Sequence, residues 1–250
     1  MSKSDATENA FLKLVYQAVA WANVADNAAS SPFTHIDYSL NTADICPVGA
    51  LTSNDFRFQM RVWFLKETKT IDVNCGTGTN ITVWTRENKI HRITPRQNDE
   101  VNSCWMPDSH RLNFHHIDSD ARLTEPLLRD AAGKHQSASW TQAHEAIANA
   151  LRQFPANQIA IIGSGRMTNE ELFLTKRLST ALGVTHLDIV PRTGEADNYL
   201  VHADKNPNTA GARLILGTEP GSQLSAIRDK VDRGEITTVI ALQENLLKKA

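Results

Sequence analysis

The second half of the chain alternates short apolar segments with amphipathic ones, and this alternation is the strongest constraint on its fold. Strands are predicted at residues 158–163 (QIAIIG), 186–190 (HLDIV), 212–217 (ARLILG) and 236–242 (ITTVIAL). Helices are predicted at residues 141–154, 169–183 and 222–234. Strands that alternate with helices of this length favour a parallel sheet covered by helices. We therefore expect residues 117–250 to form a layered α/β domain with a mainly parallel sheet.

A different pattern precedes this domain. Large apolar and polar residues alternate in 56–64 (FRFQMRVWF), 80–85 (NITVWT) and 89–93 (KIHRI), which predicts three strands of a small β-rich module over residues 34–116. Residues 1–33 hold one predicted helix, over 8–29, which ends before Pro32 because proline cannot continue a helix.

Composition excludes several classes of protein. A hydrophobic content of 41%, a charged content of 22% and a net charge of −2 are typical of a globular protein and argue against a dedicated nucleic-acid binder. No apolar run reaches the roughly 18 residues of a membrane helix, so no direct membrane insertion is expected. The N-terminus shows no secretory signal, and three widely spaced cysteines do not suggest disulfides. These features favour a cytoplasmic protein.

Motifs that would assign an enzyme activity are few, and no catalytic constellation is recognisable in the chain. Gly163-Ser164-Gly165 follows a predicted strand, where a phosphate-binding turn would lie, but the third glycine of a dinucleotide motif is missing. Cys104 is interpreted as a small buried residue or an incidental thiol. A mixed zinc site could in principle use Asp72, Cys75, His91, His110, His115 and His116. Their spacing matches no compact zinc motif.

Several collinear segments carry a family resemblance. They are CPVGALT from Cys46, IDVNC ending at Cys75, WMPD at 105–108, RLTEPLLR at 122–129 and IIGSGRMTNEELFLTKRLSTALGV at 161–184. Together they resemble the iron–sulfur region of the large (G) subunit of bacterial NADH:quinone oxidoreductase, followed by the start of a molybdopterin-oxidoreductase-type α/β domain. The resemblance implies that residues 34–116 are similar to a 4Fe-4S Mo/W bis-MGD-type domain. It also implies that residues 117–250 are truncated relative to the family.

The resemblance implies iron–sulfur ligand positions, most of which have changed in this chain. The positions of one family [4Fe–4S] cluster read Asp72, Cys75, Thr79 and Pro107, and only the second is a thiol. Cys46 is similar to the remote ligand of a second cluster, but no cysteine precedes it here. Cys46 and Cys75 are therefore interpreted as vestigial metal-ligand positions, and no cofactor is expected.

The resulting hypothesis is a shortened component of an NADH:quinone oxidoreductase that is similar to the large iron–sulfur subunit, structural in role and without its own cluster. It would contact other subunits of a respiratory-type complex and reach the cytoplasmic side of the membrane through them. Two alternatives stay open: a free-standing cytosolic protein whose α/β domain binds a nucleotide or pterin, and a non-functional fragment that keeps only the scaffold.

Overall fold

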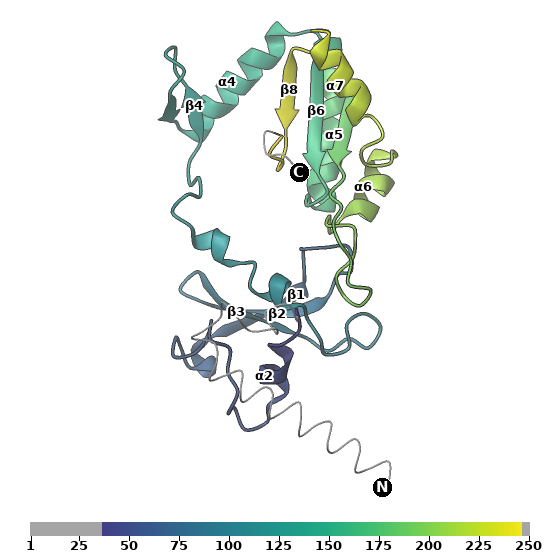
Figure 1. Ribbon diagram of the computed structural model, residues 1–250. Helices are drawn as coiled ribbons and strands as arrows, with labels where there is room; N and C mark the ends of the chain where they lie inside the picture. Colours follow the sequence, from purple (N-terminus) through teal and green to yellow (C-terminus); the bar gives the residue numbers. More distant parts are fainter. Residues whose placement is uncertain (1–36, 247–250) are drawn as a thin grey trace. The chain divides into compact units, whose positions relative to one another are not determined.

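The computed structural model describes residues 37–246, which divide into two compact units (Figure 1). Unit 1 contains residues 37–72 and Thr77–Asp118, and unit 2 contains Val73–Gly76 and the chain from Ser119 onward. The predicted helix at residues 8–29 lies outside the described residues.

Unit 1 is built on a three-stranded antiparallel sheet in the order β1-β2-β3. The strands are β1 (Lys66–Ile71), β2 (Asn80–Arg86) and β3 (Lys89–Pro95). The last two confirm the predicted strands at 80–85 and 89–93. Glu87 and Asn88 join them with φ angles of 50° and 62°. Positive φ at both central residues is what a two-residue hairpin turn requires, because its twist then matches that of the strands.

The prediction of a strand at residues 56–64 is wrong. The segment forms turns and then a 3₁₀ helix, η2 (Val62–Phe64), before β1 begins. Phe58 has a φ of 63°, a left-handed conformation that a strand cannot contain. Two arginines of this segment lie over aromatic rings instead. Cζ of Arg57 is 4.7 Å from the ring centre of Phe58, and Cζ of Arg61 is 5.5 Å from that of Trp63.

Short helices complete unit 1. They are α2 (Asn41–Ile45), α3 (Asp108–Arg111) and the 3₁₀ helix η3 (His115–Asp118). The unit buries Ile81, Met106 and Phe114. Several polar side chains are equally buried, so unit 1 has a mixed rather than an apolar interior.

Unit 2 contains a parallel three-stranded sheet in the order β7-β6-β8, which confirms the predicted α/β architecture. Its strands are β6 (Ile159–Ser164), β7 (His186–Val190) and β8 (Thr238–Ala241). Every residue of β6 is buried. Because successive side chains of a strand point to opposite faces, Ala160 and Ile162 pack with Ile227 of α7 (Leu224–Asp232), whereas Ile159 and Ile161 pack with Leu151 and its neighbours. The central strand is thus covered on both faces.

Two long helices begin at capping boxes that can be read directly in the sequence. They are α4 (Trp140–Gln153), capped by Ser139 and Gln142, and α5 (Asn169–Leu182), capped by Thr168 and Glu171. In each, the cap side chain accepts a hydrogen bond from a free backbone N–H and the residue three positions on returns one. Both predicted helices are confirmed, and α5 runs beside the sheet in Figure 1.

Residues 212–217 are not a strand as predicted but the end of helix α6 (Thr209–Leu216). The Asn208 side chain accepts a hydrogen bond from the N–H of Gly211, and Gly217 ends the helix with a φ of 78°. Ala212 is fully buried against Met167 and Leu172. The segment 117–140 contains a hairpin of β4 (Leu127–Arg129) and β5 (His135–Ser137).

Candidate functional site

Three of the four positions that the resemblance assigns to cluster ligands lie in unit 1. Asp72 follows β1, and its carboxylate lies 2.5 Å from Nδ1 of His110, with both side chains at least 91% buried. Thr79 is fully buried, and its hydroxyl has no hydrogen-bond partner within residues 37–246. Pro107 immediately precedes α3 in extended conformation.

Cys75, the remaining position, belongs to unit 2 and is 1% exposed. Its thiol donates a hydrogen bond to the carbonyl of Leu200 at 3.7 Å and accepts one from the N–H of His202 at 3.5 Å. The next residue, Gly76, donates its N–H to the carbonyl of Asp204 at 2.9 Å. These contacts attach residues 75–76 to the segment at 200–204.

These residues do not fit a [4Fe–4S] cluster, which requires four soft ligands. The Asp72 carboxylate is already bound to an imidazole, the Thr79 hydroxyl is a weak ligand for iron, and Pro107 offers no side-chain ligand. Within the described part of the chain, no group of three or more His, Cys, Asp or Glu side chains is placed to hold a metal ion. His115 instead pairs with Asp55, its Nε2 lying 2.8 Å from the carboxylate.

The other two cysteines differ in their surroundings. Cys46 follows α2, and its thiol faces backbone N–H groups of the turn that ends at Leu51. The hydrogen bond from Leu51 lowers the pKa of the Cys46 thiol most, with further backbone N–H groups of the turn adding to it. This turn therefore stabilises a thiolate at the position that resembles a remote cluster ligand. Cys104 is exposed, so its interpretation as a buried residue is wrong.

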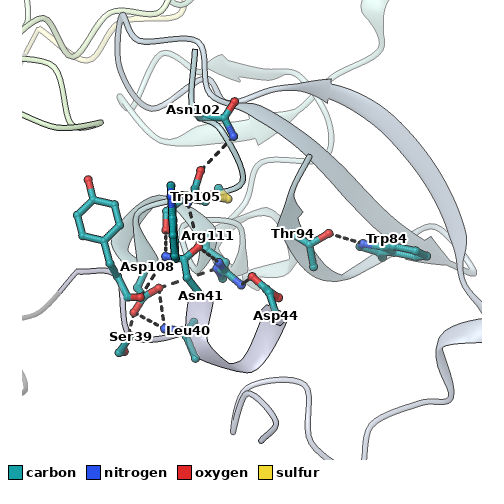
Figure 2. Close-up of polar contacts among 12 residues, drawn as sticks. Ser39, Leu40, Asn41, Asp44, Trp84, Thr94, Asn102, Trp105, Asp108 and Arg111 are labelled. Carbon is teal, nitrogen blue, oxygen red and sulfur yellow. Dashed lines mark hydrogen bonds and ion pairs between the residues drawn. The ribbon is translucent and has the colours of Figure 1, made fainter. Parts of the chain in front are cut away.

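A buried polar network joins α2 to α3 in unit 1 (Figure 2). Arg111 donates from Nη1 to Asp44 at 2.5 Å and from Nη2 to the side-chain oxygen of Asn41 at 3.0 Å. Asp108 accepts hydrogen bonds from the hydroxyl of Ser39 at 2.7 Å and from the N–H of Leu40 at 3.0 Å.

Burial and ion pairing act in opposite directions on the two carboxyl groups of this network. Burial raises the pKa of both Asp44 and Asp108, and Arg111 opposes the change in each. For Asp108, the hydrogen bond from Ser39 also lowers the pKa and so opposes the effect of burial. The network is thus a set of partly desolvated charges that stabilise one another.

A cavity of about 270 Å³ lies in unit 1 beside this network and is partly lined by Asp44 and Arg111. Arg92, on β3, also lines it. The Arg92 guanidinium lies 4.6 Å from the ring centre of Trp84 and 4.9 Å from that of Phe56. Trp84 is held in turn by a hydrogen bond from its indole N–H to the hydroxyl of Thr94 at 2.8 Å, which Figure 2 shows.

The turn Gly163-Ser164-Gly165 in unit 2 has a packing explanation. A Cβ on Gly163 would lie 2.7 Å from Cδ1 of Ile189, and one on Gly165 would lie 2.5 Å from Cγ of Asn206. Both distances are too short for a larger residue. The two glycines are therefore required by close contacts within unit 2, and they give no separate reason to expect a phosphate.

Sequence reasoning missed most of the buried polar pairs. From the sequence, Asp72 was a former cluster-ligand position and a possible zinc ligand, and His110 was a possible zinc ligand, but no pattern paired the two. Asn41, Asp44, Arg92 and Arg111 carried no signal of their own. The partners in the network are separated by 67 to 70 residues, so no local pattern connects them. The i,i+3 spacing of Asp108 and Arg111 was the one local signal, and the structure places those charged groups 4.0 Å apart.

Among residues 37–246, no helix has the length and apolar character needed to cross a membrane.

Comparisons with known proteins match two families along the chain. Residues 65–115 match the NADH-ubiquinone oxidoreductase NDSU1/NuoG-like 4Fe-4S domain, and residues 122–238 match the molybdopterin oxidoreductase family. The two matches correspond in order to the motifs that carry the resemblance.

Similar proteins include subunits of respiratory NADH dehydrogenases. The 78 kDa subunit of mitochondrial NADH-ubiquinone oxidoreductase from Neurospora crassa is 36% identical over 208 residues, covering 78% of this chain and 28% of the relative. The NADH-quinone oxidoreductase G subunit of Rickettsia conorii is 33% identical over 194 residues, covering 74% of this chain and 28% of the relative. The mitochondrial NADH dehydrogenase (ubiquinone) iron-sulfur protein 1 of Solanum tuberosum is 29% identical over 203 residues, covering 79% of this chain and 27% of the relative.

The matched region thus spans little more than a quarter of each of these relatives. Within that region the order of the two domains is the same as in the motifs, a 4Fe-4S-type module and then a molybdopterin-oxidoreductase-type α/β domain. The chain therefore belongs to the family of the large iron–sulfur (G) subunit of NADH-quinone oxidoreductase, within the molybdopterin oxidoreductase superfamily.

Proposed function

We propose that this chain serves as a structural component of an NADH:quinone oxidoreductase, in the place of its large iron–sulfur subunit, and holds no iron–sulfur cluster of its own. The homology to that subunit supports the assignment to this complex. Three of the four positions that resemble cluster ligands are Asp72, Thr79 and Pro107, none of which is a thiol, and this supports a structural rather than an electron-carrying role.

One observation carries the cluster-free part of the proposal: the buried pair of Asp72 and His110. The Asp72 carboxylate lies 2.5 Å from Nδ1 of His110, so it already has a buried side-chain partner. Binding iron there would require breaking this pair in a buried environment, which is costly. The pair thus replaces a metal ligand by a contact between two side chains at the same position.

Other subunits of a respiratory-type complex are the proposed partners. The relatives from Neurospora crassa and Rickettsia conorii are named as oxidoreductase subunits, which supports this choice. Through such partners the chain would lie peripherally on the cytoplasmic side of the membrane. A role in binding nucleic acid is not part of the proposal.

Metal analysis tests the cluster-free part. The full chain is purified under anaerobic conditions, and iron and acid-labile sulfide are measured per chain. The expected result is a colourless protein with neither, whereas about four of each per chain would overturn the proposal. The Solanum tuberosum relative, which is named an iron-sulfur protein, is prepared in parallel as the control for cluster loss during purification.

Co-purification tests the assignment to a complex. The chain is tagged in its own cells, extracted with mild detergent and analysed by mass spectrometry against an untagged strain. We expect enrichment of other NADH-quinone oxidoreductase subunits. A chain recovered without any of them would refute the structural role in that complex, whatever the result of the metal analysis.

A further inference from the structure

The cavity in unit 1 has a mainly apolar wall with a few charged groups. It has a volume of about 270 Å³, and its apolar lining includes Leu40, Leu51, Phe56, Val62, Ile93 and Phe114. Pockets that bind small molecules have this composition, an apolar wall with a small number of placed polar groups. The volume lies just below the usual range for drug-sized ligands, so its occupant would have on the order of ten to fifteen non-hydrogen atoms.

Four charged side chains line the cavity: Asp44, Asp55, Arg92 and Arg111. Asp44 pairs with Arg111 at 2.5 Å, and the Asp55 carboxylate lies 2.8 Å from Nε2 of His115. The guanidinium of Arg92 forms no ion pair or hydrogen bond with any residue in 37–246. Arg92 is therefore the one charged side chain of the cavity wall whose hydrogen-bonding groups have no partner among the described residues, although the charge of Asp44 acts on it from a distance.

Arg92 is held in a manner that suits a ligand. Its guanidinium is stacked at 4.6 Å from the ring centre of Trp84 and 4.9 Å from that of Phe56, and its Nε is buried without a hydrogen-bond partner. Burial lowers the pKa of Arg92, and Asp44 opposes this only in part. The two rings hold the guanidinium in place, and a guanidinium can form the paired hydrogen bonds that carboxylates accept.

We propose that this cavity binds a small organic carboxylate with an apolar body, whose carboxylate pairs with Arg92 and whose body contacts Phe56, Leu51 and Phe114. The bound anion would supply the hydrogen-bond acceptors that the Arg92 guanidinium lacks within residues 37–246. This inference does not rest on the proposed role in an oxidoreductase complex, because it is argued from the lining of the cavity alone.

Three matched ligands test the proposal: 4-phenylbutyrate, 4-phenyl-1-butanol and 4-phenylbutylamine. They share the apolar body and differ in charge, and their binding to the full chain is measured by isothermal titration calorimetry. We expect 4-phenylbutyrate to bind at least about tenfold more tightly than the alcohol, because a hydrogen bond to a charged group is worth that much. Equal binding of the acid and the alcohol, or tighter binding of the amine, would overturn the proposal.

Variants locate the binding. Arg92→Gln should reduce the affinity for 4-phenylbutyrate about tenfold or more and leave the affinity for the alcohol unchanged. Ala43→Phe, which places a ring in the cavity from α2, should abolish binding of both without altering Arg92. Arg86→Gln is the matched control, since Arg86 pairs with Glu87 and does not line the cavity. Unchanged acid binding in folded Arg92→Gln or Ala43→Phe protein would refute the site.

Discussion

Asn41 is the residue whose removal should affect unit 1 most. It is 1% exposed, and its side chain makes four hydrogen bonds. Its NH₂ group donates to the carbonyls of Tyr38 at 3.1 Å and Met106 at 2.8 Å. Its oxygen accepts from the N–H of Met106 and from Arg111, both at 3.0 Å. One amide therefore joins α2 to the start of α3.

The magnitude follows from the groups that Asn41→Ala would leave behind. The N–H and carbonyl of Met106 and one N–H of Arg111 would lose this partner in a buried position. An unsatisfied buried group costs roughly 1–3 kcal/mol, and more when charged. Allowing for relaxation, we expect the free energy of unfolding of unit 1 to fall by about 3–5 kcal/mol.

Urea-induced unfolding measures this effect. Tryptophan fluorescence reports mainly on unit 1, which contains Trp63, Trp84 and Trp105, whereas unit 2 contains Trp140. Asn54→Ala is the matched control: the same substitution at an exposed site in unit 1 should change the free energy of unfolding by no more than about 0.5 kcal/mol. If Asn41→Ala cost no more than this control, the reasoning from buried hydrogen bonds would be wrong.

Three further results are expected. His110→Ala leaves the Asp72 carboxylate buried without its imidazole and should cost unit 1 about 3–5 kcal/mol in the same urea assay; a loss below about 1 kcal/mol would contradict a buried pair. Burial raises the pKa of Glu244, but the hydrogen bond and charge of Arg192 outweigh it and hold that pKa below its usual value. The contribution of the Arg192–Glu244 pair to stability is therefore complete above about pH 4.3, the pKa of Glu in the unfolded chain, and is lost as the pH falls through the lower pKa of Glu244 in the folded protein. Arg192→Gln should remove this acid-dependent loss in urea titrations between neutral pH and about pH 3. An unchanged pH dependence in the variant would refute the role of the pair. Cys75 is 1% exposed, so a thiol reagent followed by mass spectrometry should label it only after unfolding, and labelling of the native protein would contradict its burial.

Local sequence signals predicted much of unit 2. The helices predicted at residues 141–154 and 169–183 are α4 and α5, and the strand predicted at 158–163 is β6. Apolar periodicity indicates such elements within a short window, so it can be recognised without knowing the fold. The capping boxes at Ser139 and Thr168 act over one helical turn and set where the two helices begin.

Two local predictions were wrong because tertiary contacts outweighed propensity. Residues 212–217 are apolar enough for a strand, but burial of Ala212 against Met167 and Leu172 and the cap at Asn208 make them helical. In residues 56–64, alternation predicted a strand, whereas Phe56 contacts Arg92 of β3 and Phe58 adopts a left-handed conformation, which no strand contains. In short segments, such contacts contribute as much free energy as intrinsic preference does.

Residue identity and order alone indicated the family and the order of the two domains, and they showed that Asp72, Thr79 and Pro107 are not thiols. The partners of these side chains follow from the tertiary structure. The contact of Asp72 with His110 joins residues 38 positions apart, and the missing hydrogen-bond partner of the Arg92 guanidinium within residues 37–246 emerges only when the partner of each neighbour is known. Pairing and burial are properties of long-range contacts, which local pattern does not encode.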